Sequence, residues 1–80
     1  MLTEYIEAAM KKAKYEILRD DNTFYGYIPG FDGVYANSVN LETCRLELKE
    51  VLEEWTLLSI SRHLQLPVVD GIELVVKETV

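Results

Sequence analysis

The first stretch that could carry chemistry is FYGYIPGFDGVYANS, residues 24–38, because closely spaced glycines can form a loop that holds a phosphate. Such a loop leads directly into a helix N-terminus, whose free backbone N–H groups and dipole meet the anion. Here Gly30 and Gly33 lead into a predicted strand, and the lysine and following Ser or Thr of a P-loop are missing. The stretch therefore predicts turns between two strands, in which Pro29 and Gly30 suit a type II turn.

Acidic residues offer a second possible chemistry, a metal site. A two-metal nuclease needs several carboxylates within a few ångströms of one another. The predicted strands place only Glu16 and Glu73 on a common face, and solvated charge is the usual explanation for glutamates on a helix. We therefore predict no catalytic group, no metal site and no cofactor. A metal-dependent, RNA-acting enzyme with Glu16 and Glu73 as ligands is the alternative.

Two further residues could be reactive. His63 lies in the last turn of a predicted helix, where the helix dipole stabilises a cation, and the spacing places no nucleophile beside it. Cys44 falls on the apolar stripe of the same helix, where a small buried residue is a better explanation than a nucleophile. We predict structural roles for both.

Composition narrows the class of protein. The 80 residues carry a formal net charge of −6, which disfavours binding to nucleic acid or anionic lipid and favours a basic protein partner. The single cysteine cannot form an internal disulfide, and no apolar stretch approaches 18 residues. We expect one cytoplasmic domain over residues 1–80, with neither a membrane span nor a C-terminal DNA-binding module.

The hydrophobic periodicity predicts an α+β fold. The expected elements are a helix over 3–12 capped by Thr3, strands over 14–19, 24–28 and 34–37 in an antiparallel meander, a helix over 41–64 capped by Asn40, and a strand over 72–77 after an Asp70-Gly71 turn. The long helix would act as a right-handed crossover, so that the fourth strand lies parallel to the first and the helix covers one sheet face.

The two faces of the predicted sheet differ in character. The covered face would carry Tyr15, Ile17, Phe24, Ile28, Val34, Ile72, Leu74 and Val76, and the open face Tyr25, Tyr27, Tyr35, Glu16, Glu73 and Val75. Three tyrosines on an open face could stack on RNA bases, but the negative charge of the chain favours a protein interface. We predict that Tyr25, Tyr27, Tyr35, Glu16 and Glu73 bind a partner.

The long helix has apolar residues on two sides. Its core stripe would be Leu41, Cys44, Leu48, Val51, Leu52, Trp55 and Leu58. At 100° per residue, Leu57, Ile60 and Leu64 point roughly the opposite way, so one sheet cannot cover both sides. Either the opening helix or a second subunit must bury these three residues. We predict a homodimer or tetramer, with the opening helix contributing to the interface.

Taken together, the order of elements and several motifs resemble the HicB-like antitoxin family. The motifs are YEI, YGYIPGFDGVYA, NLETCRLELKEVLEEW and LPVVDGI, with Pro29, Gly33, Asn40, Cys44 and Trp55 at the matching positions. The resemblance implies an incomplete RNase H-like fold without the carboxylate cluster of a nuclease. It also implies a partner, a small basic mRNA interferase of the HicA type that the chain binds and blocks. An orphan homo-oligomeric domain without a toxin is the other alternative.

Overall fold

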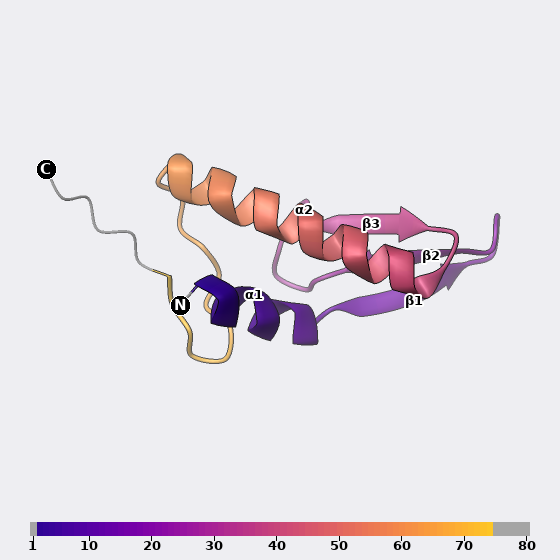
Figure 1. The fold of residues 1–80 in the computed structure, drawn as a ribbon, viewed down its shortest axis with the longest axis horizontal. Helices are drawn as coiled ribbons and strands as arrows, with labels where there is room; N and C mark the ends of the chain where they lie inside the picture. Colours follow the sequence, from indigo (N-terminus) through magenta and orange to yellow (C-terminus); the bar gives the residue numbers. More distant parts are fainter. Residues whose placement is uncertain (1, 75–80) are drawn as a thin grey trace, which may run out of the picture.

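The computed structural model describes residues 2–74, which form an elongated α+β domain (Figure 1). The element order is α1 (Leu2–Lys11), β1 (Lys14–Leu18), β2 (Thr23–Tyr27), β3 (Tyr35–Ser38) and α2 (Leu41–Ser61). No helix within the described residues is long and apolar enough to cross a membrane.

The three strands form an antiparallel sheet in the order β1-β2-β3, as the predicted meander requires. Tyr15 pairs with Gly26, and Gly26 pairs in turn with Ala36, so these three residues lie on one face. Helix α2 packs against this face over β2 and β3. The edge strand β1 is less well covered, and Ile17 on the covered side is therefore 62% exposed.

Small residues let α2 approach the sheet closely. A Cβ atom built on Gly26 would lie 3.2 Å from Cys44 Sγ and 2.9 Å from two ring carbons of Tyr15. Cys44 is fully buried against Ala36 and Gly26, which explains why a small apolar residue occupies this position. The sheet-facing half of the core is thus closely packed.

The other half of the core lies under the second half of α2, where α1 and the loops pack (Figure 1). The ring of Phe31 contacts Tyr5 at 6.2 Å and Trp55 at 5.2 Å between centroids. Leu66 and Val69, which follow α2, are also buried in this cluster. The segment after α2 therefore belongs to the core of the same domain.

The predicted fourth strand is not a member of the sheet in the described residues. Val69 and Ile72 form an isolated antiparallel bridge around the predicted Asp70-Gly71 turn, in which both residues have positive φ. Positive φ at both central positions is the signature of a tight hairpin turn, so the chain doubles back here instead of continuing to β1. Ile72 and Leu74 pack against the core, and Leu74 shares a surface pocket with Ile60 and Leu64 near the end of α2. Residues 75–77 of the predicted strand lie outside the described residues.

The ends of the helices show which capping predictions were correct. Asn40 caps α2 by accepting a hydrogen bond from the Thr43 backbone N–H at 2.7 Å, as predicted. The prediction of Thr3 as the first cap was wrong, because α1 begins at Leu2 and Thr3 lies in its first turn.

Helix α2 ends at Ser61, three residues before the predicted end. His63 has φ 56°, its N–H bonds to Ile60 O, and the Leu64 N–H bonds to Ser59 O at 2.9 Å. This pattern is a Schellman motif, which satisfies the last carbonyl groups of a helix. His63 thus follows the helix and is not in its last turn.

The buried stripe of α2 also differs from the prediction near its C-terminus. Cys44, Leu48 and Leu52 are fully buried as expected, but the stripe continues through Thr56 and Ser59. Leu41 and Leu58 are 46% and 48% exposed. A straight helix rotates 100° per residue, so positions 52, 56 and 59 stay on one side while position 58 turns away from it. The direction in which each side chain leaves the helix, and not its hydrophobicity, therefore explains why Thr56 and Ser59 are buried while Leu58 is exposed.

A candidate protein-binding surface

The open face of the sheet carries the predicted tyrosine cluster. Tyr25 stacks on Tyr27 with ring centroids 5.7 Å apart and on Tyr35 with centroids 6.1 Å apart, each pair inclined by 30°. Glu16 lies on β1 directly opposite Tyr25 in the register. We call the surface formed by Tyr25, Tyr27, Tyr35 and Glu16 the tyrosine face. Successive side chains of a strand point to opposite faces of the sheet, so the tyrosine face lies on the side away from α2. The Tyr35 side chain is 57% exposed.

One end of the tyrosine face is held by a hydrogen-bond network. Asn37 Nδ2 donates to Thr23 Oγ1 at 2.7 Å and to Phe24 O at 2.8 Å, which ties β3 to β2. Thr23 Oγ1 in turn donates to Asp21 Oδ1 at 2.6 Å. Hydrogen bonds from the Thr23 side chain and backbone to the carboxylate lower the pKa of Asp21. This network fixes the register of the strands that carry the tyrosines.

The glycine-rich stretch at the other end forms turns, as predicted. Phe31 N–H bonds to Ile28 O and Val34 N–H bonds to Phe31 O, so two tight turns follow each other. Gly30 and Gly33 sit at the third position of these turns with φ 87°, which only glycine adopts readily. The turns lead into β3, and the helix N-terminus that a phosphate loop needs does not follow them.

The structure separates the two glutamates proposed as alternative metal ligands. Glu16 lies on β1, whereas Glu73 lies beside Ile60, His63 and Leu64 near the end of α2. The predicted placement of Glu73 on the open sheet face was therefore wrong, because the turn at residues 70–71 directs the chain elsewhere. Among residues 2–74 no group of three or more His, Cys, Asp or Glu side chains could hold a metal ion.

Cys44 lies in a closed environment. Its Sγ atom is 3.6 Å from the carbonyl oxygens of Phe24 and Ala36, to which the thiol can donate. Burial raises the pKa of the Cys44 thiol, and the nearby carboxylate of Glu47 raises it further. A protonated, buried thiol is a poor nucleophile, so the environment favours the predicted packing role.

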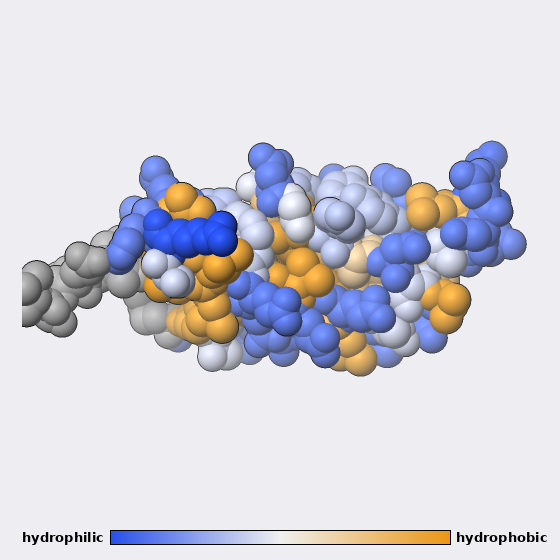
Figure 2. All heavy atoms as spheres, turned by 90° about the horizontal axis from the view of Figure 1, so that it is seen from above, coloured by the Kyte–Doolittle hydropathy of each residue, from blue (hydrophilic) through white to orange (hydrophobic). Residues whose placement is uncertain are grey.

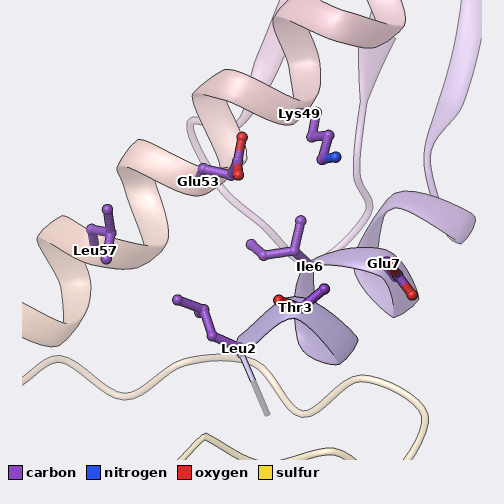
Figure 3. A pocket seen from close by; sticks show the side chains of 7 residues that line it. All are labelled: Leu2, Thr3, Ile6, Glu7, Lys49, Glu53 and Leu57. Atoms are coloured by element: carbon purple, nitrogen blue, oxygen red, sulfur yellow. The ribbon is translucent and has the colours of Figure 1, made fainter.

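A second surface is the groove between the two helices, which Figure 3 shows from close by. Leu2 and Ile6 project from α1 toward α2, and Leu57 lies on the α2 side. The groove has a volume of about 310 Å³. Thr3, Glu7, Lys49 and Glu53 complete its lining. The opening helix therefore lies against α2 near Leu57 but leaves that side chain 57% exposed.

The other two residues of the predicted oligomer interface lie further along. Ile60 is partly buried against the core, and Leu64 is 57% exposed beyond the helix end. On the side of the molecule seen in Figure 2, hydrophobic surface gathers near the end where α2 terminates and is broken up elsewhere by hydrophilic side chains. The described part of this chain thus covers Ile60 in part and leaves Leu57 and Leu64 largely uncovered.

Sequence patterns did not predict which part of the domain the segment after α2 contacts. Tyr5 Oη donates to Pro67 O at 2.6 Å, and Lys12 Nζ lies 2.8 Å from Asp70 Oδ1. These contacts join the first helix and the residue after it to positions more than fifty residues away in the chain. A groove of about 460 Å³ lies between Pro29-Gly30 and residues 67–70, and Lys14 also lines it. Only the tertiary structure brings these segments together.

The fold and its surfaces define a small two-layer domain, in which a helix covers one face of a three-stranded sheet and the other face presents stacked tyrosines. The chain belongs to the UPF0150-like family, whose model matches residues 4–67. It is similar to TTHA0281 from Thermus thermophilus, whose crystal structure has 35% sequence identity and a TM-score of 0.89. The match covers 96% of this chain and 95% of that chain. No curated protein matches the sequence.

Proposed function

We propose that this chain is a HicB-like, antitoxin-type interaction module that binds and neutralises a small basic mRNA interferase of the HicA type. The observation that carries the proposal is the tyrosine face, an ordered aromatic surface on the side of the sheet that α2 does not cover. Tyrosines are enriched at protein interfaces because they combine a large apolar area with a polar tip.

Charge supports the same choice of partner. The chain carries a net charge of −6, and complementary charge increases the association rate with a basic protein. The order helix, antiparallel meander, helix also supports the resemblance to an incomplete RNase H-like frame. An antitoxin of this kind would act in the cytoplasm by covering the RNA-binding surface of the toxin.

The test is co-expression with any small basic protein that is encoded beside the gene. We expect the two chains to co-purify and the wild-type chain to restore growth that the basic protein inhibits. A Tyr25→Ser/Tyr35→Ser variant should lose both effects, whereas Leu57→Ser, which changes the helix groove, should keep them. The absence of a complex and of rescue with the wild-type chain would contradict the proposal.

A second candidate function is that of an orphan homo-oligomeric domain without a toxin. The exposed Leu57 and Leu64, together with Leu2 at the mouth of the helix groove, favour self-association as a dimer or tetramer. Closed two-fold pairing is the commonest arrangement for a single apolar patch. Sedimentation of the wild-type chain at micromolar concentration tests this candidate independently of any toxin.

A further inference from the structure

We propose that the tyrosine face recognises an arginine side chain, whose guanidinium group lies against the tyrosine rings and pairs with Glu16. This inference builds on the proposed function, because it names the group of the basic partner that the surface binds.

The ring geometry provides the first argument. Tyr25 occupies the centre of the cluster and stacks on both Tyr27 and Tyr35, with centroids 5.7 Å and 6.1 Å away. Stacked rings fix each other's orientation, so their exposed surfaces are ready to receive a ligand without loss of side-chain freedom. A cation within about 6 Å of such a ring centroid is attracted by its negative face.

Glu16 provides the second argument. It stands directly opposite Tyr25 in the β1–β2 register, where the Cβ atoms of a cross-strand pair are neighbours. Glu16 is exposed, and it forms no ion pair with any residue from 2 to 74. An aromatic ring beside an unpaired carboxylate matches arginine, because a guanidinium stacks on rings through its plane and bonds to a carboxylate through its edge.

The alternative ligand for stacked aromatic rings is a single-stranded nucleic acid. Proteins of that kind combine aromatic rings with a positively charged groove that follows the phosphates. On the open side of the three described strands the only cation is Lys14, opposite Tyr27, and the chain as a whole is acidic. A cationic side chain therefore fits the surface better than a polyanion.

The experiment uses the full chain and a hexa-arginine peptide, with binding followed by backbone amide NMR shifts at low salt. We expect shifts on β1, β2 and β3 around the tyrosine face, and little binding of the neutral hexa-citrulline peptide. Tyr25→Phe keeps a ring and should bind like the wild type. Tyr25→Leu should bind roughly two- to five-fold more weakly, the range for an exposed cation–π contact. Thermal unfolding of both variants confirms that the fold is intact.

A matched pair of charge variants separates local pairing from net charge. Glu16→Gln and Glu54→Gln each remove one negative charge, but Glu54 lies on α2. We expect the affinity for hexa-arginine to fall for Glu16→Gln roughly two-fold or more and to change much less for Glu54→Gln. Equal loss in both variants, unchanged affinity in Tyr25→Leu, or shifts confined to the helix groove would overturn the inference. So would stronger binding of hexauridine at the tyrosine face.

The outcomes also separate this inference from the proposed function. Hexa-arginine binding at the tyrosine face without any complex with the neighbouring basic protein would contradict only the proposed function. A complex with that protein that forms equally well with Glu16→Gln and Tyr25→Leu would contradict only the arginine site.

Discussion

The close approach of α2 to the sheet leaves almost no space for a side chain at Gly26. A Cβ atom there would lie 2.9 Å from two ring carbons of Tyr15 and 3.2 Å from Cys44 Sγ. Overpacking of this kind destabilises a protein by about 1–3 kcal/mol. Replacing glycine by alanine also lowers the entropy of the unfolded chain, which stabilises the fold by about 0.4–1 kcal/mol. We therefore expect Gly26→Ala to lower the free energy of unfolding by about 1–2 kcal/mol.

Urea unfolding followed by the fluorescence of Trp55, the single tryptophan, measures this change. The matched control is Gly33→Ala, where φ is 87° and no atom lies within 4 Å of the added Cβ. That variant should also lose stability, but through backbone strain of about 1–2 kcal/mol and not through a contact.

A double-mutant cycle distinguishes the two causes. In a Tyr15→Val background the ring is gone, so the cost of Gly26→Ala should fall by about 1 kcal/mol or more. The cost of Gly33→Ala should stay the same in both backgrounds. Equal costs of Gly26→Ala with and without the Tyr15 ring, or wild-type stability of the single variant, would refute the close-packing argument.

Three other perturbations test separate features. Thr56 Oγ1 is buried without a hydrogen-bond partner in the described structure. Thr56→Val should therefore raise the free energy of unfolding by about 1 kcal/mol in the same urea assay. A lower free energy of unfolding in the variant would show that the hydroxyl has a partner. The Leu57→Glu/Ile60→Glu variant should sediment as a monomer at micromolar concentration, whereas the wild type should sediment as a dimer or tetramer. A monomeric wild type, or a variant that assembles like the wild type, would exclude the predicted oligomer interface. Because the folded-state pKa of Asp21 lies below its ordinary value of 3.8, its stabilising contribution is present above pH 3.8 and is lost as the pH falls through the folded-state pKa. Melting temperatures below pH 4 should therefore fall more steeply for the wild type than for Asp21→Asn, and parallel curves would argue against the Thr23 hydrogen bonds.

Local patterns in the sequence determined most of the secondary structure. Alternation predicted the three strands to within one residue at each end, because a strand with one buried face repeats every two residues. The Asn40 cap and the turn at Gly30 were predictable because each depends on neighbouring residues only. The same alternation placed Tyr25, Tyr27, Tyr35 and Glu16 on one open face.

Features that depend on distant contacts could not be predicted in this way. Glu73 was misplaced because the path after α2 follows from the burial of Leu66 and Val69 in the core and from the Tyr5–Pro67 hydrogen bond, and alternation over residues 72–77 carries no information about these contacts. The end of α2 at a left-handed His63, where glycine is the usual residue, likewise has no clear sequence signal. The sequence by itself determined which residues share a face of each of the three strands. Only the tertiary structure decided which elements meet, because packing between segments far apart in the chain selects among locally acceptable paths.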